Sequence, residues 1–343
     1  MDSLRARIAR RLERGIAPSV PGRALAGAWA AIAAARVARP VTLPEGARIV
    51  GVGGAVLGGA GKTPVAIELA RALALEGHDV AFIGHGYRAR AASARRILPA
   101  DPVDLVGDDA LCAARALAAT DTPVFVAKRR EGALALAVRS GKTLLVVDGL
   151  LQASPRRLDD AVLVLDGASP FGAGVCPPLG DLRAPASALV EAADHVVALG
   201  GARSPALPAS MVPLASTIDG ALDASGRRHD LASLASRRVG LLVAIARPDR
   251  LLTALDRERI HPRAALCLAD HACFDPGTLD RARDLHLDAW LTTARCATKL
   301  PPRLGGAPVL ALDHRIDVGP LLARLSFRGS REGVPACARL PAP

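Results

Sequence analysis

The stretch Gly58-Gly59-Ala60-Gly61-Lys62-Thr63-Pro64 decides the fold class of this 343-residue chain. It follows an apolar run, residues 49–52, that predicts a buried strand, and it precedes residues 65–76, which predict a helix ending at Gly77. A glycine-rich loop between a strand and a helix can wrap a phosphate with its backbone N–H groups, and the helix N-terminus adds a positive dipole. We therefore expect residues 58–64 to bind the phosphates of ATP or GTP.

The side chains of this loop have separate expected roles. Lys62 reaches the β- and γ-phosphates, and the Thr63 hydroxyl binds Mg²⁺. The motif departs from its usual form at Val56, which stands where the first glycine is expected. The alternative is an ordinary glycine-rich turn whose lysine faces water.

Further apolar runs alternate with helical patterns along the chain. They predict strands at 80–83, 124–126, 144–147, 162–165 and 195–199, and then at 240–244, 264–268 and 289–292. This alternation is typical of a parallel sheet covered on both faces. We expect an α/β fold with a P-loop NTPase-like parallel sheet flanked by helices, a second smaller α/β domain and an N-terminal helical membrane-associating segment.

The same patterns predict the domain boundaries. The expected division is N-terminal amphipathic or interfacial helices at 1–39, a nucleotide-binding domain at 40–200, a hinge or linker at 201–238, a second α/β domain at 239–325 and a flexible tail at 326–343.

Composition limits the function. The net charge of +11 indicates an anionic partner, which the charge alone leaves open as nucleotide, phospholipid or nucleic acid. Aromatic residues make up only 2% of the chain, which disfavours stacking on single-stranded nucleic acid. The six cysteines form no C-x-x-C pair, so neither a zinc site nor a disulfide framework is expected.

The N-terminal segment is basic and amphipathic. Leu4, Ile8, Leu12 and Ile16 are spaced four apart with arginines between them, which predicts a helix with one apolar face. Residues 24–35 are apolar but too short to span a hydrocarbon core of about 30 Å. The segment can lie in a membrane interface, or it can pack on the protein as a helical hairpin.

Four acidic or basic side chains are candidates for a site beside the loop. Asp148 ends the apolar strand 144–147, where a carboxylate can support Mg²⁺; otherwise it caps a turn. Asp108 and Asp109 open a predicted helix, where one of them can be a plain N-cap. His271 follows a predicted strand and matters only if the second domain closes over the nucleotide.

Several motifs in chain order resemble one family. The loop string Val56-Leu57-Gly58-Gly59-Ala60-Gly61-Lys62-Thr63-Pro64 resembles that of the tetraacyldisaccharide 4'-kinases, the lipid A 4'-kinases. The other similar stretches are Gly84–Arg88, Val106–Asp109, Val147–Gln152, Phe171–Gly174 with Pro178–Pro185, Ala244–Arg250, Asp270–His271 and Thr293–Leu300. The resemblance spans about residues 40 to 312, and the ordered set is far more specific than any single motif.

The resemblance implies a reaction: ATP phosphorylates the 4'-hydroxyl of a tetraacyldisaccharide 1-phosphate, with ATP and Mg²⁺ as cofactors. It implies that Asp108 takes the hydroxyl proton and that His271 pairs with it. It further implies a peripheral protein on an anionic lipid surface, the cytoplasmic face of the inner membrane of a Gram-negative-type bacterium. A glycolipid is the implied substrate, and nucleic acid is not an expected partner.

The chain departs from the family pattern at several positions. Gly149, Ala153, Ala294 and Cys296 stand where the family has polar or acidic residues, and Gly84-His85 replaces Ser-Arg. These changes leave open a catalytically impaired nucleotide-binding protein at the membrane surface, or a P-loop NTPase with another substrate. Leu57 stands where partition ATPases need lysine, and the Asn-Lys-x-Asp motif of GTPases is missing from the sequence.

Overall fold

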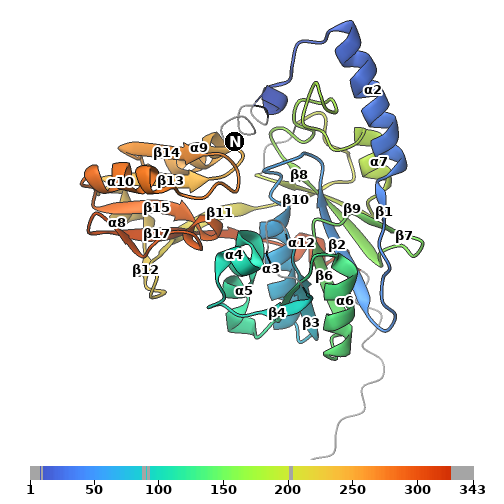
Figure 1. Cartoon of the computed structure of the whole chain (residues 1–343), viewed down its shortest axis with the longest axis horizontal. Coiled ribbons are helices and arrows are strands. Elements are labelled where there is room, and N and C mark those ends of the chain that lie inside the picture. Colours follow the sequence, from blue (N-terminus) through green and yellow to red (C-terminus); the bar gives the residue numbers. More distant parts are fainter. Residues whose placement is uncertain (1–7, 9–10, 87–89, 91–92, 201–203, 326–343) are drawn as a thin grey trace, which may run out of the picture.

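The computed structural model describes residues 8, 11–86, 90, 93–200 and 204–325, and two sheets organise this part of the chain (Figure 1). The first has eight strands in the order β10-β9-β8-β2-β6-β3-β5-β4, and all neighbours are parallel except the edge pair β5 and β4. Its strands are β2 (Arg48–Gly54), β3 (Val80–Ile83), β4 (Arg95–Ile97), β5 (Val124–Val126), β6 (Leu144–Asp148), β8 (Asp160–Asp166), β9 (His195–Leu199) and β10 (Val212–Leu214).

Both faces of the first sheet are buried. Along β6, Val146 faces one core cluster and the adjacent Leu145 and Val147 face another, as the two-residue period of a strand requires. Helices α3 and α5 contribute to the first cluster, and α6 contributes to the second. The helices around this sheet are α3 (Lys62–Leu75), α4 (Val103–Val106), α5 (Asp108–Ala116), η1 (Ala118–Thr120), α6 (Arg130–Arg139) and α7 (Ala186–Glu191).

The second sheet lies beside the first (Figure 1) and has the order β12-β11-β17-β15-β13-β14, with β16 paired to β17. Its strands are β11 (Ser216–Leu222), β12 (Arg228–His229), β13 (Val239–Ala244), β14 (Ala264–Leu268), β15 (Ala289–Thr293), β16 (Arg303–Leu304) and β17 (Ala307–Ile316). Its helices are α8 (Leu231–Ala235), α9 (Pro248–Arg257), α10 (Pro276–Asp284) and α11 (Ala294–Ala297). The predicted α/β class, with a flanked parallel sheet and a smaller second sheet, is confirmed.

Two predicted segments differ from the structure. The described part of the stretch predicted as linker, residues 204–238, contains β10, β11, β12 and α8, because β10 extends the first sheet and β11 pairs with β17 in the second. Residues 316–325, predicted in the second domain, return to the first: Ile316, Val318, Leu321 and Leu325 are buried in its core, and α12 (Gly319–Leu322) contacts β10. Local apolar patterns could not reveal these long-range pairings.

In the N-terminal region, residues 20–35 form a helix that lies beside α7 (Figure 1), and Ala30 and Ala33 pack against the core cluster that contains Leu163 and Leu165 of β8. Of the predicted helix over residues 1–16, the structure describes Ile8 and residues 11–16, and it is helical at Ile8 and at 11–14. Helix α2 (Val20–Ala35) starts four residues earlier than expected, because Ser19 accepts a hydrogen bond from the Gly22 N–H and Pro21 fits the first turn. After it, β1 (Ala38–Pro40) pairs in parallel with β7 (Gln152–Ser154).

Within the described residues, none of the helices combines the length and apolar character needed to cross a membrane. The predicted tail at 326–343 and the predicted motif residues 87 and 88 lie outside the described residues.

Candidate active site

The glycine loop lies between β2 and α3, as predicted. Gly59 and Gly61 have positive φ angles of 70° and 79°, and Gly61 is the N-cap of α3. The φ of Gly61 is one that residues with a side chain rarely adopt, and a Cβ there would also contact Leu199 Cδ1, so glycine is favoured at this position. These turns leave the backbone free of side chains at the N-terminus of a 14-residue helix, where phosphate groups bind.

Val56, the departure from the usual loop motif, is a structural residue here. It is 3% exposed and forms an isolated antiparallel bridge with Leu182. Its carbonyl oxygen accepts a hydrogen bond from Arg183 Nε at 2.7 Å. The entrance to the loop is therefore held by the segment around Leu182 and not by a glycine turn.

Thr63 and Asp148 meet at the mouth of the loop. Thr63 Oγ1 donates a hydrogen bond of 2.7 Å to Asp148 Oδ2, while Asp148 Oδ1 is buried without a hydrogen-bond partner among the described residues. Burial raises the pKa of Asp148, and the Lys62 charge opposes that rise. An unsatisfied carboxylate oxygen beside a hydroxyl oxygen fits a hard divalent cation such as Mg²⁺.

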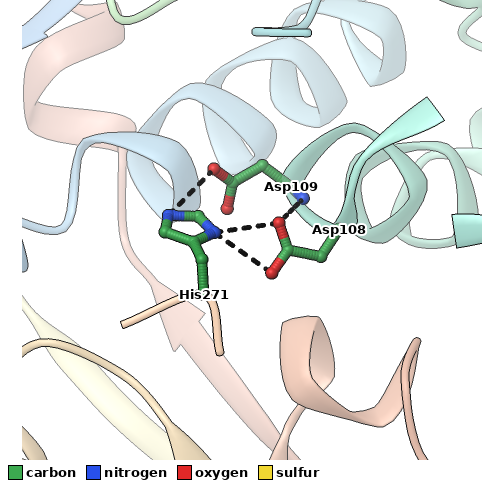
Figure 2. Close-up of side chains that lie close together, drawn as sticks. All are labelled: Asp108, Asp109 and His271. Atoms are coloured by element: carbon green, nitrogen blue, oxygen red, sulfur yellow. Dashed lines mark hydrogen bonds and ion pairs between the residues drawn. The ribbon is translucent and has the colours of Figure 1, made fainter. Parts of the chain in front are cut away.

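Asp108 and His271 are brought together from different sheets, 163 positions apart in sequence. His271 Nδ1 lies 2.9 Å and 3.1 Å from the two Asp108 carboxylate oxygens (Figure 2). Asp108 opens α5, and His271 adopts a left-handed φ of 57° in the turn after β14. Burial opposes ionisation of Asp108, but the hydrogen bonds and charges of His271 and Lys299 outweigh it and hold the pKa of Asp108 well below its ordinary value.

Two basic residues from the second sheet, which sequence reasoning did not single out, complete this cluster. Lys299 Nζ donates to Asp108 Oδ2 at 2.8 Å and to the Ala272 carbonyl at 3.1 Å. Arg295 Nη1 lies 3.0 Å from His271 Nε2 and 3.4 Å from Asp109 Oδ1, and its Nη2 pairs with Asp270 Oδ1 at 2.6 Å. Residues four apart on a helical stretch lie on the same face, and this spacing of Arg295 and Lys299 was the sequence signal that they could act together.

Arg295 fixes the orientation of the histidine ring. Its Nη1 lies 3.0 Å from His271 Nε2, while His271 Nδ1 faces the Asp108 carboxylate. The imidazole is therefore held between the guanidinium and the carboxylate.

Asp108, Asp109 and His271 also form a possible cation-binding group, because one ligand atom from each lies within 4.8 Å of the others. Figure 2 shows the imidazole between the two carboxylates. Lys299 and Arg295 already supply positive charge to those oxygens. The pair Thr63 and Asp148 is therefore the better metal site of the two.

Arginines from the second sheet also reach the phosphate loop. Arg250 Nη1 donates to the Gly59 carbonyl at 3.0 Å and pairs with Asp166 Oδ2 at 2.7 Å. Arg247 Nη2 pairs with the buried Asp181 at 2.6 Å. A mostly apolar cavity of ≈ 290 Å³ lies beside Gly58 and is lined by both sheets and by the N-terminal residues Ile8 and Leu12.

Replacements of family-like polar residues have structural explanations at two positions. Cys296 is completely buried and its sulfur accepts a hydrogen bond from the Ala244 N–H at 3.3 Å. Ala153 is buried in β7. These two side chains pack in the hydrophobic cores of the protein.

The chain is similar to known proteins over most of its length. The family model described as tetraacyldisaccharide-1-P 4'-kinase matches residues 22–325. A tetraacyldisaccharide 4'-kinase of Chromobacterium violaceum is 35% identical and aligned over 74% of each chain. That of Methylobacterium sp. (strain 4-46) is 33% identical over 90% of this chain and 94% of its own.

A solved structure shares the fold. The crystal structure of LpxK from Aquifex aeolicus in complex with ATP aligns with a TM-score of 0.67 at 17% identity, covering 90% of this chain and 97% of that one. The predicted family resemblance is confirmed, because the family model and the relatives above 30% identity cover most of the sequence. This chain belongs to the tetraacyldisaccharide 4'-kinase family.

Proposed function

We propose that this protein transfers the γ-phosphoryl group of ATP to the 4'-hydroxyl of a tetraacyldisaccharide 1-phosphate. The observation that carries the proposal is the convergence of Asp108 and His271 from two sheets, in a chain of this kinase family that also has a complete Gly-Lys-Thr loop. The test is transfer of labelled phosphate from ATP to the lipid disaccharide in detergent micelles. An impaired or different P-loop NTPase is not favoured, because the loop, a metal-binding pair and an acceptor-side carboxylate are all present.

In this proposal the loop residues Gly58 to Pro64 hold the ATP phosphates. Backbone N–H groups and the α3 dipole bind the β-phosphate, and Lys62 neutralises the β- and γ-phosphates. Thr63 and Asp148 hold Mg²⁺, whose positive charge offsets the negative charge that develops on the phosphate oxygens.

Asp108 acts on the acceptor in this proposal. The 4'-oxygen attacks the γ-phosphorus, the bond between that phosphorus and the β–γ bridging oxygen breaks, and the hydroxyl proton passes to the Asp108 carboxylate. Its low pKa makes Asp108 a weak base, but phosphoryl transfer depends more on positioning and charge than on base strength. His271 and Lys299 fix the carboxylate orientation and keep it ionised.

We further propose a peripheral position on an anionic lipid surface, at the cytoplasmic face of the inner membrane, and no nucleic-acid partner. On α2, Ala30 and Ala33 pack against the protein, whereas the larger Leu25, Trp29 and Ile32 are about half to three-fifths exposed. Their spacing places them on one face of the helix, which suits burial among lipid headgroups and acyl chains.

The proposed domain division has two parts. Residues 40–200 form the nucleotide-binding unit, and residues 239–315 form most of the second domain.

The membrane proposal predicts binding to vesicles. The full chain is expected to float with vesicles containing anionic lipid, and Leu25→Asp with Ile32→Asp is expected to lower partitioning by about 10- to 100-fold, since each side chain loses on the order of 1 kcal/mol of apolar burial. Leu75→Asp, at an equally exposed position on α3, is the control and should bind as the wild type does. Equal binding of the α2 variant and the wild type would rule out this face.

A further inference from the structure

Three basic side chains from different elements converge beside Asp148 at the end of β6. A Cβ atom placed on Gly149 would lie 2.9 Å from Arg130 Nη2, 3.7 Å from Lys62 Cε and 3.8 Å from His85 Cδ2. Lys62 comes from α3, Arg130 from α6, and His85 from the segment after β3. The space above Gly149 is therefore lined by basic groups next to the phosphate-binding lysine.

The charge of Arg130 is only partly balanced. Its Nη2 donates to the carbonyls of Asp148 at 3.0 Å and Gly149 at 3.1 Å, which carry no net charge. Its Nε is buried without a hydrogen-bond partner among the described residues. The nearby carboxylates are Glu131 and Asp148, and Asp148 also interacts with Lys62.

Other basic residues surround the space above Gly149. Burial, and then the charges of Arg39 and Arg183, lower the pKa of Arg130 to about 10, so its guanidinium stays protonated at neutral pH. Burial and the charges of Arg130 and Lys62 lower the pKa of His85 to about 4, which leaves that imidazole neutral. Several like charges clustered around one carboxylate favour the binding of an additional anion.

We infer that Arg130 is a further catalytic residue, which binds the γ-phosphoryl group of ATP while it is transferred. The inference rests on the proposed binding of ATP to the loop. Lys62 is expected to bind the β- and γ-phosphates, and Arg130 Nη2 and Lys62 Cε lie 2.9 Å and 3.7 Å from the same point above Gly149. A guanidinium placed there stabilises the charge on the phosphoryl oxygens in the transition state.

Gly149 makes this approach possible. Its φ is +74°, a conformation that side-chain-bearing residues rarely adopt, and a Cβ there would lie 2.9 Å from Arg130 Nη2, so the guanidinium would have to shift. The family pattern has an aspartate at this position. In our inference, glycine removes that carboxylate and leaves room for Arg130 to reach the phosphates. The departure at Gly149 is thus linked to the position of Arg130.

The test compares nucleotides with and without a γ-phosphate. Binding of Mg·ADP and of the non-hydrolysable Mg·AMP-PNP is measured by calorimetry for the wild type, Arg130→Ala, Arg130→Lys and Gly149→Ala, together with kcat for lipid phosphorylation. Arg139→Ala is the matched control, because Arg139 is exposed at the other end of α6. Melting temperatures establish that each variant is folded.

The expected result is a selective loss. Arg130→Ala should weaken AMP-PNP binding by about 10- to 100-fold with less than a twofold change for ADP, as befits one lost charged hydrogen-bonding group. Its kcat should fall by on the order of 10³-fold, with partial recovery in Arg130→Lys. Gly149→Ala should show the same selective loss, and Arg139→Ala should match the wild type.

Two outcomes would overturn the inference. Equal weakening of ADP binding and AMP-PNP binding would show that Arg130 maintains the loop and does not bind the γ-phosphoryl group. Unchanged binding of both nucleotides with a raised KM for the lipid would place Arg130 on the acceptor's own phosphate. If the selective loss appears but no variant, wild type included, phosphorylates the lipid, the proposed acceptor fails while the assignment of Arg130 stands.

Discussion

Asp108→Asn is expected to lower kcat for lipid phosphorylation by about 10²- to 10⁴-fold, the usual contribution of a positioned proton acceptor. The amide keeps the shape of the carboxylate, and its oxygen can still accept from Lys299 or His271, but it cannot take the hydroxyl proton. Initial rates at saturating ATP and lipid measure the effect. AMP-PNP affinity should stay within about threefold of the wild type, because the proposed function places Asp108 at the acceptor and not at the nucleotide.

The control for this variant is Asp104→Asn. Asp104 lies on the neighbouring helix α4 with its side chain 63% exposed, so its loss should leave kcat unchanged. A decrease of less than about threefold in Asp108→Asn would show that Asp108 is not the proton acceptor. An accompanying loss of nucleotide affinity would show instead that Asp108 maintains the shape of the loop.

Lys62→Ala is expected to lower kcat/KM for ATP by at least about 10³-fold. Lys62 is the first residue of α3, and its charge acts on the buried Asp148. Without it, the β- and γ-phosphates lose their principal side-chain cation and the repulsion from Asp148 is unopposed. Steady-state rates over a range of ATP concentrations, with calorimetry for AMP-PNP, measure the loss.

Lys128→Ala serves as the charge control for Lys62→Ala, because Lys128 is an exposed lysine on the first domain. It should retain the wild-type rate. If Lys62→Ala retained more than a tenth of the wild-type kcat/KM, the glycine loop would not be the ATP phosphate site, and the turn with a solvated lysine would be the better description.

Much of the first sheet could be predicted from the sequence. Strands β3 and β5 begin and end at the predicted residues, because strands buried on both faces appear as continuous apolar runs. The edge strand β4 (Arg95–Ile97) was missed, since two of its three residues are arginines. Strands β11 and β17 were missed, and they pair with each other between residues about 90 to 100 positions apart in the sequence.

The candidate site was predictable only in part. The loop and Thr63 follow β2, and Asp148 ends the adjacent parallel strand β6, so their positions relative to two predicted strands were enough to place them together. Asp108 and His271 come from separate sheets, and only the family resemblance paired them. Arg295 and Lys299 stand on a short stretch whose neighbours depart from the family pattern, so their contacts emerged only from the folded chain.

Arg130 gives a structural reason to reconsider one departure from the family pattern, the glycine at position 149. From the sequence, Gly149 was a lost acidic residue and pointed to impaired catalysis. In the folded chain it is the position that admits the Arg130 guanidinium to the end of β6. The inference that Arg130 binds the γ-phosphoryl group thus depends on a contact that local sequence could not reveal.

The most direct measurement is phosphoryl transfer from [γ-³²P]ATP to tetraacyldisaccharide 1-phosphate in detergent micelles, with the full chain, Mg²⁺ and Lys62→Ala in parallel, and with the product analysed by NMR. We predict a bisphosphorylated lipid that carries the new phosphate on the 4'-oxygen, formed steadily by the wild type and at background level by Lys62→Ala. Tight binding of ATP by the wild type with no labelled lipid, or label at another hydroxyl, would contradict the proposed function.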